Sequence, residues 1–245
     1  MTTLSDSSFR WAFLALMGML TFSPVGADAG MTPAEVEAFE GFKVKAEQGD
    51  ASSQFETGYC YARGSGTPRD FTAAANWYRK SAEQGNARAQ NALGVFYYGG
   101  LGVPKSHSEA VYWYRKAASQ NYPQAQSNLG GSYERGEGVP VNLLEAIALY
   151  RKSAEQGHAW GLYHLAKCYA EGKGVMADNA TAYALFNLAT LSKDTKGPEP
   201  EESAKLNLAK LEGKMPAEAL QRGQRIALQL RKDIEARKAA GKVGN

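Results

Sequence analysis

The sequence has little of what nucleic-acid binding requires. Its 28 lysines and arginines are nearly balanced by 25 aspartates and glutamates, which gives a formal net charge of +3. The basic residues are scattered, whereas nucleic-acid binding needs clustered Lys and Arg that displace counterions. The basic cluster at residues 231–238 is interrupted by Asp233 and Glu235, which is typical of a solvated helix face. We therefore expect no nucleic-acid partner.

The sequence also lacks the motifs of common catalytic and cofactor sites. It contains no Gly-x-Ser-x-Gly and no serine followed three residues later by lysine, and the glycine pairs complete neither a phosphate loop nor a dinucleotide fingerprint. His158 and His164 are six residues apart, a spacing that does not place them on one helical face for metal ligation. Repeated carboxylates such as Glu109 and Glu145 are expected to be surface charges. The sequence predicts no enzyme activity, no cofactor and no metal.

The first 29 residues differ in composition from the rest. Arg10 precedes a short apolar run, Trp11 to Phe22, which is followed by Ser23-Pro24 and then by Ala27-Asp28-Ala29. A basic residue, a short apolar segment and a small-x-small site together predict a signal peptide at residues 1–29, cleaved after Ala29. The run is shorter than the ~20 residues that span a bilayer. We expect a periplasmic or secreted protein. The alternative is an uncleaved signal anchor, which would be the only part of the protein in contact with a membrane.

From Ala46 onward the sequence is a tandem array with a period of 36 residues. Four copies without insertion or deletion are expected at 46–81, 82–117, 118–153 and 154–189, and a fixed period in this range indicates stacked structural repeats. In each copy, apolar residues at three- and four-residue spacings predict two amphipathic helices. One such pair cannot bury its apolar faces alone, so the copies must stack. The predicted fold is all-α, a right-handed α-solenoid of helix-turn-helix repeats.

The second copy shows the local signals most clearly. Its first helix is predicted from Asn86 to Tyr98, and the glycines after it, including Gly100, accept the left-handed conformation that ends a helix. Ser106 or Ser108 is expected to cap the second helix. Ala110 recurs as alanine in every copy, which predicts a close contact between the two helices.

Several of these motifs resemble Sel-1-like repeats, which are relatives of tetratricopeptide repeats. The resemblance rests on Leu93-Gly94-x-x-Tyr97, on the Gly-x-Gly-Val of residues 100–103, 136–139 and 172–175, and on the Trp-Tyr-Arg-Lys-Ala of residues 113–117. Met215-Pro216-Ala217-Glu218 is similar to the start of the divergent last unit of bacterial members. The resemblance implies an α-solenoid adaptor, and it names no partner because function depends on sites and not on the fold.

The two ends of the array are expected to cap it. Thr32-Pro33-Ala34-Glu35 predicts the start of a helix that runs to about Ala46, within an N-terminal capping segment at residues 30–45. A loop is expected at 192–200, followed by helices at 201–211 and from 216 to about 237. We interpret residues 190–245 as a divergent helical hairpin that closes the array with a polar outer face.

Only two cysteines are present, and they occupy the same position of copies one and four. Cys60 and Cys168 are three periods apart, so at ~10 Å between stacked helices they are expected ~30 Å apart. A disulfide needs Cα atoms within ~7 Å. We predict two buried, unpaired thiols; a bridge between chains or a reactive thiol is the alternative.

The positions that vary between copies are the candidates for binding. On each first helix, offsets of three, seven and ten residues place such positions on one face, and these faces are expected to line a concave groove that holds a protein or peptide partner. Trp160 and Tyr163 are the expected anchor because large aromatic side chains dominate interface energetics, although packing against a terminal cap is an equal alternative. The candidate partner-binding residues are Phe55, Tyr59, Arg88, Asn91, Val95, Tyr98, Gln124, Glu134, Trp160, Tyr163 and Lys167.

Two other functions stay open from the sequence. In a module that binds a cell-envelope glycan or peptidoglycan, Tyr59, Tyr98, Trp160 and Tyr163 would stack on sugar rings. A hydrolase acting on the envelope is a remote alternative, because the sequence shows no nucleophile with a base.

Overall fold

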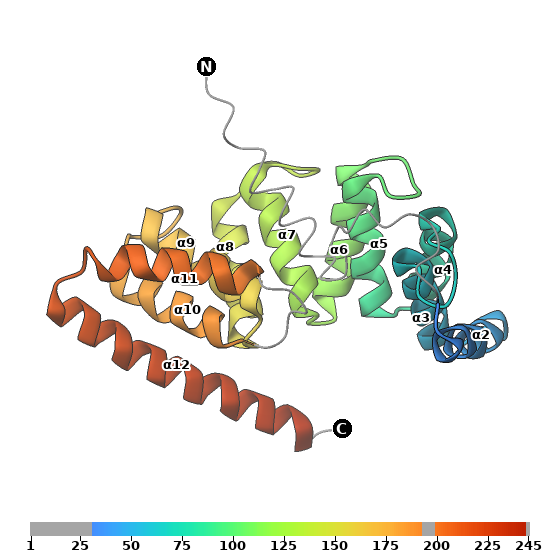
Figure 1. Cartoon of the computed structure of the whole chain (residues 1–245). Coiled ribbons are helices and arrows are strands. Elements are labelled where there is room, and N and C mark those ends of the chain that lie inside the picture. The colour runs from blue at the N-terminus through green and yellow to red at the C-terminus, as the bar shows by residue number, and fades with distance from the viewer. Residues whose placement is uncertain (1–30, 193–198, 244–245) are drawn as a thin grey trace. The chain divides into compact units, whose positions relative to one another are not determined.

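The computed structural model describes residues 31–192 and 199–243, and within them it has eleven α-helices and no strand (Figure 1). The described part of the chain is all-α, as predicted. It divides into two compact units, and the boundary in the sequence falls between Tyr122 and Pro123. The predicted signal peptide lies outside the described residues.

Unit 1 contains one leading helix and two helix pairs. These are α2 (Pro33–Glu47), α3 (Ala51–Arg63), α4 (Phe71–Glu83), α5 (Ala87–Gly99) and α6 (His107–Ser119). Helix α3 packs against α4 and α5 against α6 within each pair, while α2 packs against α3 and α4 against α5 along the stack. The helix-loop-helix repeat expected from the 36-residue period is therefore observed.

Unit 2 contains two further pairs and the C-terminal helices. These are α7 (Pro123–Arg135), α8 (Leu143–Glu155), α9 (Ala159–Glu171), α10 (Asn179–Leu191), α11 (Glu199–Glu212) and α12 (Ala217–Val243). Part of the loop predicted before α11 lies outside the described residues.

Helix boundaries follow the local signals in the sequence. Thr32 caps α2 in a capping box with Glu35, and Asn86 and Ser106 cap α5 and α6. Gly100 ends α5 in the left-handed conformation, with φ 70°. After α6 the left-handed position is held by Asn121, with φ 62°, where the other copies have glycine. Asparagine tolerates this conformation better than most residues do.

Close contact between the two helices of a pair depends on small residues. Ala110 is fully buried in α6. A Cβ added to Gly94 would lie 2.6 Å from the ring of Tyr114, and Gly130 has the same relation to Tyr150 at 2.7 Å. The Leu-Gly-x-x-Tyr pattern therefore reflects packing, because its glycine lets the tyrosine of the second helix lie against the first.

A series of glutamine side chains joins the helices along the stack. In unit 1, Gln90 donates from Nε2 to the carbonyl of Ala82 at 3.0 Å and accepts at Oε1 from Gln120 at 2.7 Å. Gln54 and Gln84 repeat the side-chain pair at 2.7 Å. In unit 2, Gln156 donates to Gln126 at 2.9 Å. In the fourth copy the position of Gln126 is held by Leu162, so this side-chain pair is not formed there.

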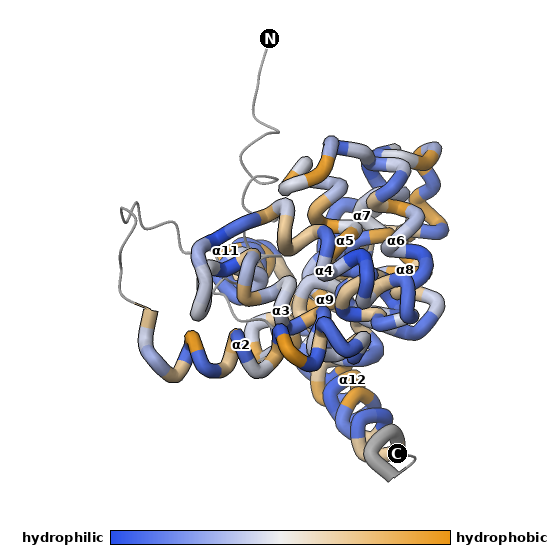
Figure 2. The backbone as a smooth tube through the Cα atoms, turned by 90° about the vertical axis from the view of Figure 1, so that its right-hand side faces the viewer, coloured by the Kyte–Doolittle hydropathy of each residue, from blue (hydrophilic) through white to orange (hydrophobic). Residues whose placement is uncertain are grey.

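The C-terminal helices both pack on α10. Helix α11 also contacts α9, whereas α12 also reaches α8, and α10 lies between α11 and α12 (Figure 1). Hydrophilic and hydrophobic residues alternate along α12 (Figure 2), and its buried positions include Gly223 and Ala227. The two helices thus use α10 as a shared support.

Both cysteines are free and buried, as predicted. Burial raises the pKa of Cys60, and it raises the pKa of Cys168 to about 11. A thiol with a raised pKa is a poor nucleophile at neutral pH.

Candidate binding surface

On each first helix, the positions equivalent to Leu93 and Gly94 are buried in every copy, whereas the recurring tyrosine, Tyr97 in α5, is half-buried and the other exposed or half-buried side chains differ between copies. In α5, Leu93 and Phe96 belong to the core, while Arg88 is exposed and Asn91 and Tyr98 are half-buried. Val95, which also varies between copies, is buried in this helix. The surface of α5 therefore carries residues that differ from those on the other first helices.

In unit 1, an ion pair connects two neighbouring first helices. The guanidinium of Arg88 in α5 lies 2.9 Å from the carboxylate of Glu56 in α3. The same guanidinium lies 4.2 Å from the ring centroid of Phe55, whose ring is buried against Tyr78. Arg88 thus covers an aromatic core residue and leaves more than half of its side chain exposed, 54%.

Two further aromatic candidates lie on the same two helices, Tyr59 on α3 and Tyr98 on α5. Tyr59 accepts a hydrogen bond at 3.0 Å from Arg63 on the next turn of α3. Tyr98 lies edge-on to the ring of His107, with centroids 4.9 Å apart. Both tyrosines are half-buried, so each presents part of its ring to solvent.

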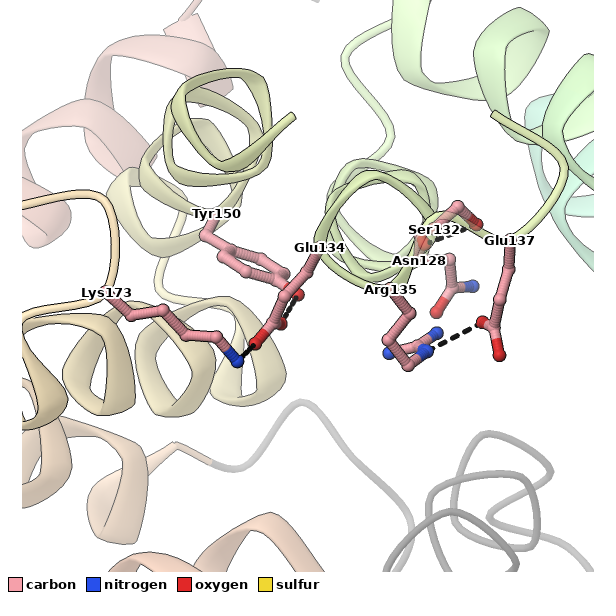
Figure 3. A network of polar contacts seen from close by, with 7 residues as sticks. All are labelled: Asn128, Ser132, Glu134, Arg135, Glu137, Tyr150 and Lys173. Atoms are coloured by element: carbon pink, nitrogen blue, oxygen red, sulfur yellow. Dashed lines mark hydrogen bonds and ion pairs between the residues drawn. The ribbon is translucent and has the colours of Figure 1, made fainter. Parts of the chain in front are cut away.

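In unit 2, the repeat position of Tyr98 is held by a carboxylate, Glu134, which Figure 3 shows with its partners. Glu134 at the end of α7 accepts a hydrogen bond at 2.7 Å from the hydroxyl of Tyr150, and another at 2.6 Å from Lys173 in the loop after α9. Burial opposes ionisation of Glu134, but the bonds from Lys173 and Tyr150 outweigh it and lower the pKa to about 2. The carboxylate is therefore ionised throughout the physiological pH range.

Aromatic rings stack beside Glu134. His164 of α9 lies parallel to Tyr150, with centroids 4.9 Å apart, and nearly parallel to Trp160 at 5.5 Å. Burial among these rings lowers the pKa of His164 to about 3, against the attraction of Glu134. The imidazole is neutral at pH 7. Tyr163 packs edge-on to Trp160 and keeps part of its ring exposed.

A second histidine has a structural role that the sequence did not reveal. His158 precedes α9 at the position of Asp50 and Asn86, and its Nδ1 accepts from the amide of Gly161 at 3.4 Å and contacts the hydroxyl of Ser153 at 3.0 Å. An imidazole therefore caps α9 where the first two copies use Asp or Asn. The sequence signal for this role is the position of His158, immediately before a first helix.

The eleven candidate residues fall into two groups. Three are buried, namely Phe55, Val95 and Trp160, which does not favour direct contact with a partner. Trp160 is 7% exposed and stacks on His164, so it offers little ring surface to a sugar. The half-buried or exposed members are Tyr59, Arg88, Asn91, Tyr98, Gln124, Glu134, Tyr163 and Lys167.

The helix pairs coincide with matches to a known family. The Sel1 repeat matches residues 51–86, 87–122, 123–158 and 161–194, and the matches follow the helix pairs from α3 and α4 to α9 and α10, with the last match beginning inside α9. The chain belongs to the Sel1 repeat family. Sel1 repeat proteins are helical scaffolds that are generally non-catalytic and typically bind other proteins.

Two solved structures support this membership. A protective antigen present in uropathogenic Escherichia coli strains, with an SLR fold, is 31% identical to this Sel1 repeat protein, with a TM-score of 0.74 over 98% of the chain. The chain spans about half of that antigen's length, 48%. A Sel1 repeat protein from Oxalobacter formigenes is 29% identical, with a TM-score of 0.67 over 78% of this chain and 76% of its own. Among curated proteins, the search found no match.

No helix among the described residues is both long and apolar enough to cross a membrane. In the same part of the Sel1 repeat chain, no group of three or more His, Cys, Asp or Glu residues is arranged to hold a metal ion.

Proposed function

We propose that this Sel1 repeat protein is an exported scaffold that binds a protein or peptide partner through the exposed, variable positions of its first helices. The observation that carries the proposal is the contrast along these helices. The positions of Leu93 and Gly94 are buried in every copy, whereas charged and aromatic side chains such as Arg88, Tyr98 and Tyr163 stay accessible and differ from copy to copy. Half-exposed aromatic and arginine side chains are common anchors of protein interfaces.

The first test identifies the partner by site-specific crosslinking. A photoreactive amino acid is placed at Asn91 or Tyr163, on first helices, or as a control at Tyr112 on second helix α6, whose side chain is 48% exposed. We expect the first-helix positions to capture the same protein and the Tyr112 position to capture none. Capture through Tyr112 alone would contradict the proposal.

The second test measures affinity for the captured partner after purification. Arg88→Ala and Tyr163→Ala should each weaken binding about tenfold, because interface anchors of this type contribute roughly 1 kcal/mol or more. Tyr112→Ala is the matched control and should leave the affinity unchanged. If the control weakens binding as strongly, the surface lies on the second helices instead.

Export is tested separately on the full chain. When the protein is produced in a Gram-negative host, N-terminal sequencing of the product should begin at Gly30, which corresponds to cleavage after Ala29. Retention of Met1 in a product that stays with the cytosolic fraction would contradict export and leave the binding proposal untouched.

A further inference from the structure

We propose that unit 2 holds a ligand pocket for a small amphipathic anion, a molecule with a short apolar body and a carboxylate-type head. A cavity of about 190 Å³ lies where α12 crosses α8, α9 and α10. Leu162, Leu165 and Leu185 line it from the repeat, and Leu230 and Ile234 line it from α12. An apolar cavity of ~150 Å³ is large enough to hold benzene, so this one accommodates a ring or a short acyl chain.

The pocket uses a face of α9 that the proposed partner surface does not. Leu162, Leu165 and Tyr169 follow one another at spacings of three and four residues, which places them on one side of the helix. Tyr163 and Lys167 belong to a neighbouring side. Ligand binding in the pocket and partner binding on the first helices are therefore separate properties.

Three features create the pocket, and two of them are changes of residue in the fourth copy. Leu162 stands where the earlier copies have a glutamine of the series that joins the helices. One of these, Gln90 in unit 1, donates a hydrogen bond to the carbonyl of Ala82. The equivalent carbonyl residue, Ala154, lines the pocket. Thr181 stands where copies two and three have glutamate. Both changes remove polar groups that would otherwise fill or charge this site.

The third feature is the covering helix α12. It packs on α10, where Asn187-Leu188 replaces the Arg-Lys pair found at residues 79–80, 115–116 and 151–152. Arg222 pairs with Asp178 at 2.8 Å, and Arg237 pairs with Glu155 at 2.5 Å. These ion pairs connect α12 to the N-terminus of α10 and to the C-terminal end of α8.

The rim carries two cations, Arg151 and Arg237, and two carboxylates, Glu155 and Asp233, and Arg151 is the group that can receive an anionic head. Glu155 is held by Arg237, and Asp233 accepts a hydrogen bond at 2.8 Å from Gln229. By contrast, Arg151 makes one long hydrogen bond, 3.5 Å to the hydroxyl of Tyr169. A guanidinium carries five N–H donors and matches a carboxylate in a bidentate geometry. Arg151 is thus the rim group with the largest remaining capacity for a ligand.

The test is calorimetric titration of the full chain with three probes of equal length: sodium octanoate, 1-octanol and octylamine. We expect octanoate to bind saturably at one site per chain and more tightly than the other two. Arg151→Gln should lower the octanoate affinity about tenfold, because a charge-assisted hydrogen bond is lost, and should leave the octanol affinity unchanged. The side chain of Arg151 is exposed, so this variant should fold normally, which its circular dichroism melting curve checks.

Leu162→Gln provides the second variant and restores the residue of copies one to three. It should lower the affinity for both octanoate and octanol, because it places an amide in the apolar part of the cavity. The matched control is Arg115→Gln, one period before Arg151, which should bind octanoate as the unmodified chain does. The proposal is overturned if neither octanoate nor octanol binds saturably, if octylamine binds more tightly than octanoate, or if Arg151→Gln and Leu162→Gln bind as the control does.

Discussion

Tyr78 of unit 1 and Tyr150 of unit 2 occupy the same position of the Sel1 repeat, two periods apart, yet their surroundings differ in chemistry. The ring of Tyr78 packs against Phe55 and Phe96, with centroids 5.5 and 5.2 Å apart. Tyr150 instead donates a hydrogen bond to a carboxylate and stacks on an imidazole. Burial raises the pKa of both hydroxyls, so each tyrosine is neutral, and only its neighbours determine whether the site responds to pH.

The difference comes from an exchange of size and polarity at equivalent positions. Ala62 and Ala92 in unit 1 correspond to Glu134 and His164 in unit 2, and Phe55 and Phe96 correspond to Ser127 and Cys168. Where unit 1 has two large rings and two small residues, unit 2 has small residues and two large titratable groups. The comparison shows that one repeat backbone can enclose either an apolar or a charged cluster of similar bulk, which lets separate copies acquire separate properties.

The largest expected effect concerns the apolar cluster. Phe96→Ala should lower the free energy of unfolding by ~3–5 kcal/mol, because it removes a buried ring and leaves a cavity between Tyr78 and Phe71. Its equivalent in the fourth copy, Cys168→Ala, removes a single sulfur and should cost about 1 kcal/mol. Urea denaturation with amide hydrogen exchange resolved by peptide will assign each loss to its unit. Equal losses would show that the two clusters are not organised around these positions.

The next effect concerns the charged cluster. Glu134→Ala should destabilise unit 2 by ~1.5–3 kcal/mol, because it leaves the buried hydroxyl of Tyr150 and the ammonium of Lys173 without their acceptor. Glu134→Gln is the control, since its amide oxygen still accepts a hydrogen bond, and it should cost less. Urea denaturation compares the two. A loss equal for both variants would mean that the charge, and not the hydrogen bonds, stabilises the cluster.

The repeat architecture was predictable from sequence because its signals are local or strictly periodic. The 36-residue period, the caps at Asn86 and Ser106 and the left-handed Gly100 each depend on residues within one copy. The prediction of unpaired cysteines followed from the period alone. Such features do not require knowledge of which side chains meet between helices.

The charged cluster was not predictable in the same way. Glu134 appeared only as one of several variable positions, since its partners Tyr150, His164 and Lys173 lie 16, 30 and 39 residues further along the chain. Their meeting depends on how two copies pack. Helical periodicity likewise identified the helix face that carries Trp160 but not the burial of its side chain. That burial comes from neighbouring rings of the same unit, which lie on other turns and helices.

The covering of α10 by α12 does have a signal in the sequence. The change from Arg-Lys to Asn187-Leu188 removes from α10 two positive charges that every earlier second helix carries and adds an apolar residue, which predicts that another element covers it. The interruption of the glutamine series at Leu162 is a second such signal. Departures from a repeat are therefore as informative as the repeat itself about how the elements that follow it pack.

A smaller effect should appear on acidification. The pKa of His164 is lowered in the folded state, so its contribution to stability is present above the unfolded value of ~6.5 and is lost as the pH falls toward about 3. Glu134 adds a second loss below ~4.3, its unfolded value, as the pH falls toward about 2. Between pH 7 and pH 5 unit 2 should therefore lose up to about 2 kcal/mol through His164, while the apolar cluster of unit 1 is unaffected.

Hydrogen exchange at pH 7 and pH 5, compared after correction for intrinsic rates, measures this loss in each unit. His164→Asn introduces the residue found at the equivalent position of copy three, Asn128, and should remove the pH dependence in unit 2 between pH 7 and pH 5. An unchanged dependence in the variant would assign it to another group.

The smallest expected effect is at Arg88 and Glu56 on the surface of unit 1. Their ion pair is short, 2.9 Å, but the two side chains are 54% and 30% exposed, and exposed pairs contribute ~0–1 kcal/mol. A double-mutant cycle with Arg88→Ala and Glu56→Ala should give a coupling energy in that range, which falls further in 1 M salt because the charges are screened. By contrast, Arg88→Ala is expected to weaken partner binding about tenfold. A coupling energy of 2 kcal/mol or more would make Arg88 primarily a stabilising residue, and its effect on binding would then have to be measured against the loss of folded protein.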